Sequence, residues 1–139
     1  LKNPNNLKSC YDFLKKYKSN DYKKFVKYSD INYKKNLVYR NTDFEIFVVC
    51  WTPKQKTLIH DHSKNGCLFK VLEGNIVEYR YNVDKSANYY QHNIGSVGYI
   101  DNQIGIHKMD NDSKTNCVTL HIYSPPNYKM NIFKNILNN

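Results

Sequence analysis

The sequence predicts a small, mainly β domain, a sandwich or barrel, that follows a short helical segment. The length of 139 residues suits one domain with one core. Apolar residues recur at spacings of three and four in about the first thirty positions, and the period changes to two from about Tyr33 onward. Short strands separated by turns are typical of all-β sandwiches and barrels. We therefore expect residues 1–139 to form one domain, with segment 1–30 packed on the barrel.

The helical prediction depends on two apolar stripes with lysines on the outer faces. Asn20 or Asp21 is a suitable cap for the second helix, because short polar side chains accept hydrogen bonds from a first helical turn. The first stripe comprises Leu7, Cys10, Tyr11, Leu14 and Tyr17, and the second comprises Tyr22, Phe25, Val26 and Tyr28.

The strand predictions follow β-branched and aromatic runs. The clearest run, FEIFVVCW at 44–51, ends at Thr52-Pro53. Glu73-Gly74-Asn75 between two runs predicts a hairpin turn. The weakly amphipathic residues 127–139 are expected to fray. The remaining predicted strands are 67–72, 75–81, 89–92, 97–100, 106–109 and 117–123.

Charge and cysteine content narrow the class of protein. The net charge of +9 is compatible with a nucleic-acid or membrane partner. The lysines are scattered or paired and form no long basic run, so we expect no partner of either kind. The charge is also compatible with attraction of an anionic substrate. No apolar run reaches the ~20 residues that span a bilayer, and the first residues lack the apolar core of a signal peptide. The four cysteines form no Cys-x-x-Cys pair. These features predict a monomer in the reducing cytoplasm.

A pair of histidines in LIHDHS is the first candidate metal site. Because residues i and i+2 of a strand face the same way, His60 and His62 can bind one ion while Asp61 points elsewhere. The alternative is two histidines in a surface loop without a metal. A further histidine, His107, lies in IGIHKMDN and is followed four residues later by Asn111.

The spacing around these histidines resembles the two-motif pattern of the cupin superfamily. Cys67 follows His60 by seven residues and Gly74 follows Cys67 by seven, while His107 and Asn111 match the second motif. The resemblance implies a double-stranded β-helix, or jelly-roll, barrel. Cys67 stands where most cupins carry a glutamate ligand. Three neutral imidazoles then leave coordination positions open for a substrate that brings its own negative donor, such as a thiolate. Zinc also binds three histidines and a water, so the ligand types leave the metal open.

A second constellation, VTLHIYSPP, places Thr119, His121 and Tyr123 at alternating positions. If one of them faces the barrel interior, all three do, and they can pass hydrogen bonds along that face. The alternative is three polar residues on the solvent side of an edge strand.

These motifs together resemble the cysteine dioxygenases, which are thiol dioxygenases within the cupins. The carrying stretches are YKKNLVYR, IHDHSKNGCLFKVLEGN, IGIHK and LHIYSPP, between about Tyr33 and Pro126. The resemblance implies one Fe(II) per chain, and it implies that Cys67 and Tyr123 are the partners of a thioether crosslink. Four of the five histidines fall on family site positions, as His60, His62 and His107 for the metal and His121 beside Tyr123. The fifth, His92, is interpreted as a surface residue.

Two family positions differ here. Thr119 replaces a serine and keeps the hydroxyl. Lys35 replaces the arginine that binds the substrate carboxylate, with Tyr33 assisting. Lysine offers one point charge where arginine offers a planar fork, so substrate choice is expected to change. The alternatives from the residues alone are a solvated lysine at Lys35 and a small buried residue at Cys67.

The implied reaction is the oxidation of L-cysteine by O2 to cysteine sulfinic acid. One alternative is a dioxygenase for another small thiol, such as 3-mercaptopropionate. A second alternative, from another class, is a cupin that binds a ligand without catalysis.

Overall fold

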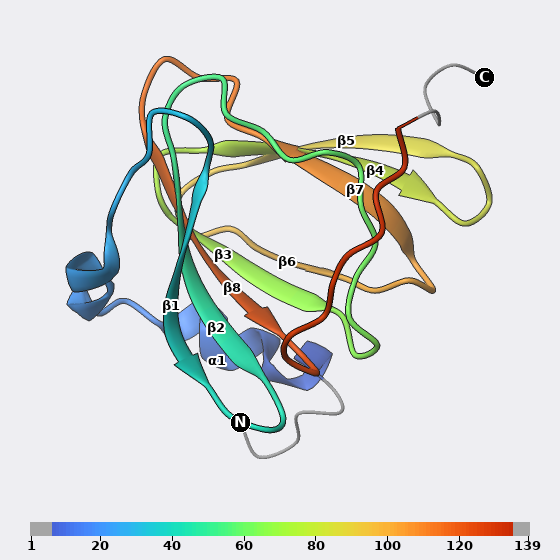
Figure 1. Ribbon diagram of the computed structural model, residues 1–139, viewed down its shortest axis with the longest axis horizontal. Coiled ribbons are helices and arrows are strands. Elements are labelled where there is room, and N and C mark those ends of the chain that lie inside the picture. Colours follow the sequence, from blue (N-terminus) through green and yellow to red (C-terminus); the bar gives the residue numbers. More distant parts are fainter. Residues whose placement is uncertain (1–6, 135–139) are drawn as a thin grey trace.

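The computed structural model describes residues 7–134, which form a mainly β molecule with three short helices at its start (Figure 1). These helices are the 3-10 turn η1 (Leu7–Cys10), helix α1 (Tyr11–Lys16) and the 3-10 turn η2 (Asp21–Phe25). The second predicted helix is therefore shorter than expected. Asn20 precedes η2 but makes no capping bond with its side chain. Among the described residues, no helix is long and apolar enough to cross a membrane.

Eight strands form two antiparallel sheets that face one another, which confirms the predicted fold class (Figure 1). The five-stranded sheet has the order β1-β2-β8-β3-β6, and the three-stranded sheet has the order β5-β4-β7. The strands are β1 (Lys34–Arg40), β2 (Glu45–Trp51), β3 (Cys67–Glu73), β4 (Ile76–Asn82), β5 (Ala87–His92), β6 (Val97–Ile100), β7 (Gly105–Asp110) and β8 (Cys117–Tyr123).

The turn at Gly74 is not the hairpin that the sequence predicts. Strands β3 and β4 belong to different sheets, so this turn carries the chain from one sheet to the other. Gly74 has a φ of +73°, and a Cβ atom there would lie 2.4 Å from the carbonyl oxygen of Asn116. Glycine is needed because the turn is both left-handed and pressed against a neighbouring backbone.

Alternation along the strands gives the five-stranded sheet two apolar faces. The inner face and the opposing sheet enclose a core that includes Phe47, Trp51 and Phe69. The outer face packs against the N-terminal helices, where Leu7 is fully buried with Leu68. The helices thus cover one face of the sheet, and the other face lines the interior of the barrel.

The side chain of Lys70 links the end of α1 to β3. Its buried ammonium donates to the carbonyl oxygens of Leu14 and Lys15 at 3.0 Å and also to that of Tyr17. The Leu14 carbonyl also accepts the Tyr17 amide at 3.1 Å, and the lysine adds a charged donor at the C-terminal end of the helix, where the backbone dipole is negative. Beside it lies a hollow of about 960 Å³, lined by five lysines. None of the predicted site residues lines this hollow.

Candidate metal centre

The loop between β2 and β3 and the strand β7 bring His60, His62 and His107 together. The backbones of His60 and His107 exchange two hydrogen bonds, of 2.9 and 3.2 Å. This isolated bridge sets their rings side by side, with centroids 4.7 Å apart. The ring of His62 lies 4.6 Å from that of His107 and 5.5 Å from that of His60. The prediction that His60 and His62 share a strand is wrong, because only the bridge at His60 is strand-like.

Asn102 holds the backbone of His62 in place. The His62 amide donates to Oδ1 of Asn102 at 2.9 Å, and Nδ2 of Asn102 donates to the His62 carbonyl at 3.0 Å. This pair of bonds replaces the ladder that a strand would provide. The orientation of the His62 ring therefore depends on a loop contact across the barrel.

Each of the three rings has a nitrogen free to bind a cation. Nδ1 of His60 lies 2.7 Å from the Leu58 carbonyl, and Nδ1 of His107 lies 2.7 Å from a carboxylate oxygen of Glu78. Because these oxygens accept, both Nδ1 atoms carry a proton, and Nε2 is the nitrogen of each ring that is left to bind a cation. His62 is buried, and neither of its ring nitrogens has a hydrogen-bond partner.

The chemistry of this set fits a divalent metal. One ring nitrogen from each histidine lies within 4.8 Å of the others, and all three residues are buried. Burial, followed by the neighbouring His107, lowers the pKa of His60 to about 3 and that of His62 to about 2. Both imidazoles are therefore neutral near pH 7, as metal ligands must be. The two partnerless buried nitrogens of His62 are costly unless they bind something.

Strand β8 directs Thr119, His121 and Tyr123 to the interior beside the metal centre. Trp51 Nε1 donates to Thr119 Oγ1 at 3.0 Å, and that oxygen lies 2.9 Å from His121 Nε2. Nδ1 of His121 lies 3.1 Å from the Tyr123 hydroxyl. The row is continuous, so the indole fixes the threonine, the imidazole and the phenol in turn.

Cys67 lies directly opposite Tyr123 in the pairing of β3 with β8. Its sulfur is 3.7 Å from Nδ1 of His121, and the residue is buried. Burial raises the pKa of the Cys67 thiol and of the Tyr123 phenol far above their usual values. Both groups therefore carry their protons at neutral pH.

Lys35 and Tyr33 line the hollow next to the histidines. The Tyr33 ring stacks on Trp51, with centroids 4.9 Å apart. The Lys35 ammonium lies 4.4 Å from the centre of the Phe47 ring and 4.8 Å from that of Tyr123. Burial lowers the pKa of Lys35, against an opposing effect of the Glu45 carboxylate.

The segment after β8 runs along the histidine loop (Figure 1). Asp61, between the two histidines, accepts hydrogen bonds from the Tyr128 hydroxyl at 3.0 Å and from the Asn131 amide at 2.7 Å. Met130 lines the hollow beside the histidines. The predicted fraying is therefore wrong up to residue 134, because these bonds hold the segment to the loop, and residues 135–139 lie outside the described part.

A sequence profile described as "Cysteine dioxygenase type I" matches residues 5–136, nearly the whole chain. The chain belongs to the cysteine dioxygenase type I family. Among curated relatives, "Cysteine dioxygenase type 1" of Danio rerio is 30% identical over 135 residues, and those of Rattus norvegicus and Homo sapiens are each 31% identical over 134 residues. Each alignment covers 87% of this chain and 66% of the relative. The chain thus spans just under two thirds of the length of these relatives.

Solved structures show the fold of this cysteine dioxygenase family member independently. A Klebsiella pneumoniae protein described as having a double-stranded β-helix domain matches with a TM-score of 0.71 and 14% identity, covering 86% of this chain and 93% of that one. A Thermus thermophilus protein matches with a TM-score of 0.67 and 17% identity, covering 78% and 98%. At these identities the likeness concerns the cupin barrel alone.

Three residues near the family site escaped the sequence analysis. Glu78 is fully buried and accepts a hydrogen bond from Nδ1 of His107. Nε2 of His92 lies 3.0 Å from the other carboxylate oxygen of Glu78, so the interpretation of His92 as a surface residue is wrong. Glu45 lines the hollow with Lys35 and pairs with Arg40 at 2.8 Å. The sequence does carry a signal for Glu78: it lies two residues after Ile76 in the predicted strand 75–81, so its carboxylate shares a face with an apolar residue.

Proposed function

We propose that this protein is an iron-dependent thiol dioxygenase that oxidises L-cysteine with O2 to cysteine sulfinic acid. The observation that carries the proposal is the position of three buried, convergent imidazoles next to the Thr119-His121-Tyr123 row. In the overall reaction both atoms of O2 end on the thiol sulfur, which loses four electrons, so no external reductant is needed.

His60, His62 and His107 would hold one Fe(II), since one ring nitrogen of each lies within 4.8 Å of the others. When bound, iron would lower the pKa of the substrate thiol and activate dioxygen. Within residues 7–134, no carboxylate joins the three rings in this group. The remaining positions would thus be left for the substrate and dioxygen.

The other residues would orient the substrate. The Lys35 ammonium, held over the Phe47 and Tyr123 rings, would pair with the substrate carboxylate, and Tyr33 would close the same side of the hollow. The Tyr123 hydroxyl, positioned through His121 and Thr119, would face the reacting sulfur. Orientation of this kind supplies a large part of a rate enhancement.

Cys67 and Tyr123 would form a thioether bond. Their direct cross-strand pairing supports this, as does the burial of the thiol. The bond would join the sulfur to a ring carbon, with loss of one S–H and one C–H proton and transfer of two electrons to dioxygen. The crosslink would fix the phenol beside His121.

We further propose that residues 1–139 act as one domain and as a cytoplasmic monomer without nucleic-acid or membrane partners. The apolar cluster shared by the N-terminal helices and the sheet supports one domain. The four free, buried cysteines are compatible with a reducing compartment.

A second substrate, 3-mercaptopropionate, is favoured by one observation. Lys35 offers the carboxylate a single charge, and the Glu45 carboxylate lies in the same hollow. A lysine imposes less geometry on a carboxylate than an arginine does, and 3-mercaptopropionate has the thiol-to-carboxylate spacing of L-cysteine without its amine, so it is a second candidate substrate.

The decisive experiment incubates the iron-loaded protein with O2 and a panel of L-cysteine, 3-mercaptopropionate and cysteamine. Mass spectrometry should find L-cysteine carrying two added oxygen atoms, together with matching oxygen uptake. Preferred oxidation of 3-mercaptopropionate would favour the second substrate. An iron-loaded protein that forms no sulfinate from any of the three would contradict the proposal and favour a ligand-binding cupin.

A further inference from the structure

Glu78 is a fully buried carboxylate that serves several donors at once. Oε2 accepts the His107 Nδ1 proton at 2.7 Å, and Oε1 lies 3.0 Å from Nε2 of His92. Arg80 Nη2 approaches both oxygens, at 3.0 and 3.2 Å. The Arg80 guanidinium carries a permanent positive charge and donates to both oxygens, so the group is a carboxylate, which only accepts.

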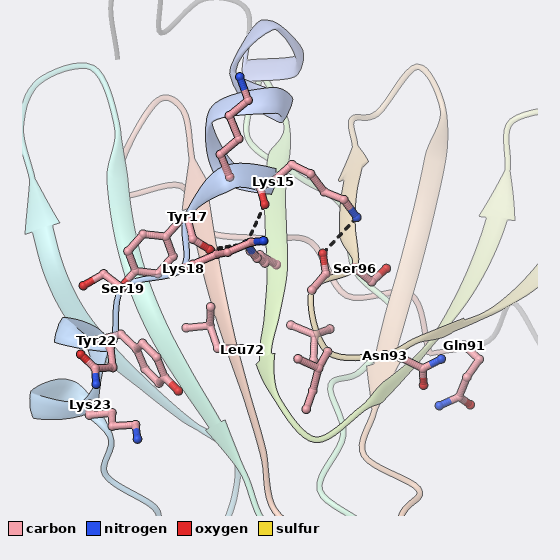
Figure 2. A pocket seen from close by; sticks show the side chains of 16 residues that line it. Lys15, Tyr17, Lys18, Ser19, Tyr22, Lys23, Leu72, Gln91, Asn93 and Ser96 are labelled. Atoms are coloured by element: carbon pink, nitrogen blue, oxygen red, sulfur yellow. Dashed lines mark hydrogen bonds between the residues drawn. The ribbon is translucent and has the colours of Figure 1, made fainter.

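His92 has a fixed place between this carboxylate and the outer surface. Because Glu78 only accepts, Nε2 of His92 carries a proton. Nδ1 of His92 lies 3.0 Å from the hydroxyl of Ser96, which borders the lysine-lined hollow (Figure 2). The imidazole packs edge-on against Phe69, with centroids 5.1 Å apart. A chain of hydrogen bonds therefore runs from His107 through Glu78 and His92 to Ser96.

The two oxygens of Glu78 divide one negative charge between competing donors. A carboxylate that accepts the outer N–H of a metal-binding histidine raises the basicity of that ligand. Each further donor on the carboxylate draws charge away from this bond. His92, which binds the oxygen that His107 does not, weakens the pull of Glu78 on the His107 proton.

We propose that His92 is a positioning residue of the metal centre, which acts through Glu78 to set how strongly His107 donates to the metal. This inference rests on the proposed function for the identity of the metal. It assigns a role to the one histidine that matches no family site position. It also predicts that the reduction potential of bound iron responds to a residue that does not contact the metal.

The test measures the iron(III)/iron(II) potential of the protein without thiol, by a redox titration followed with electron paramagnetic resonance. His92→Phe keeps a ring against Phe69 but removes the N–H. Glu78 should then pull harder on His107, and the preference for iron(III) over iron(II) should rise about tenfold. For one electron this lowers the potential by about 59 mV.

Two further variants give the comparison its controls. His92→Gln retains an N–H donor toward Glu78 and should restore the wild-type potential. Gln91→Leu changes the preceding residue on β5, which points to the other side of the strand, and should leave the potential unchanged. If His92→Phe fails to fold, Arg80→Met removes a donor from the same carboxylate and should lower the potential in the same sense.

An unchanged or raised potential in the variant that folds would overturn the proposal. This outcome is separate from the proposed function, because the titration needs neither thiol nor turnover. A wild-type protein that binds no iron would instead overturn the metal centre itself, and iron content reveals this before any variant is compared.

Discussion

The two walls of the site are built in different ways. The ligand wall, His60, His62 and His107, combines a loop with a strand of the smaller sheet. The strand wall, Cys67, Thr119, His121 and Tyr123, occupies two neighbouring strands of the larger sheet. Strand pleating directs the side chains of the strand wall to one face, and the hydrogen bonds along β8 then fix them. The ligand wall depends instead on separate contacts.

This difference indicates where each wall is vulnerable. On β8 a substitution removes one contact while the ladder still orients the neighbours. In the loop, the Leu58 carbonyl is the one hydrogen-bond partner of the His60 ring, and Asn102 is the one hydrogen-bond partner of the His62 backbone, among the described residues. We therefore expect changes at the ligand wall to affect metal retention, and changes at the strand wall to affect turnover with the metal still bound.

The largest expected effect is that of His107→Ala, which removes one of three ligands and should abolish iron retention. Elemental analysis after gel filtration measures the iron that stays bound. Tyr123→Phe, on the strand wall, should retain iron at the wild-type level. Full iron occupancy in His107→Ala would refute the assignment of the ligand wall.

Acidification should destabilise the metal-free protein next most strongly. Burial lowers the pKa of His60 and His121 to about 3 and that of His62 to about 2, from 6.5. The unfolded chain takes up protons as the pH falls below about 6.5, while the folded rings stay neutral. The contribution of these rings to the free energy of unfolding is therefore fully present above about pH 6.5. It is lost as the pH falls toward about 3, by up to about 1.4 kcal/mol per pH unit for each ring. A urea midpoint that stays constant from about pH 7 to about pH 5 would be incompatible with this.

Asn102→Ala tests the loop contacts of the ligand wall without touching a ligand. It removes both bonds to the His62 backbone, and we expect iron affinity to fall about tenfold, as for other residues that support metal ligands. Competition with a chelator measures the affinity. Gln103→Ala, at the next position, is the matched control. Equal iron affinities of the two variants would show that the bonds from Asn102 to the His62 backbone do not support the metal centre.

The smallest effect should be that of Lys35→Ala, on the side of the strand wall. Lys35 is exposed to solvent, so loss of its ion pair with the substrate carboxylate should cost about 1 kcal/mol or less, because water screens the two charges. KM should rise for L-cysteine and 3-mercaptopropionate but hardly for cysteamine, which has no carboxylate. Iron content should not change. Lys34→Ala serves as the control, and equal losses for all three thiols would remove Lys35 from substrate binding.

The strand wall was more accessible to sequence reasoning than the ligand wall. Alternation in VTLHIYSPP predicted that Thr119, His121 and Tyr123 share one face, and they do. Periodicity also predicted seven of the eight strands of the described part, but it did not single out β1. It did not predict that the turn at Gly74 changes sheets, because a turn residue specifies local conformation and not which strands pair.

Contacts between distant segments were the part that periodicity left open. The roles of Asn102 and Glu78 depend on which loop and strand meet in three dimensions. His92 was interpreted as a surface residue because it matches no family site position, and the rest of β5 is exposed. Its partner, Glu78, lies on the neighbouring strand β4, and only the pairing of these strands brings them together.

The central claim is that three imidazoles hold one iron and leave places for a thiol and dioxygen. X-ray absorption at the iron edge tests it most directly, on the loaded protein before and after addition of L-cysteine. The account predicts nitrogen scattering from three imidazoles in both states, with a sulfur neighbour appearing only after L-cysteine is added. Fewer than three imidazoles, or an unchanged spectrum because protein groups already fill the sphere, would contradict it.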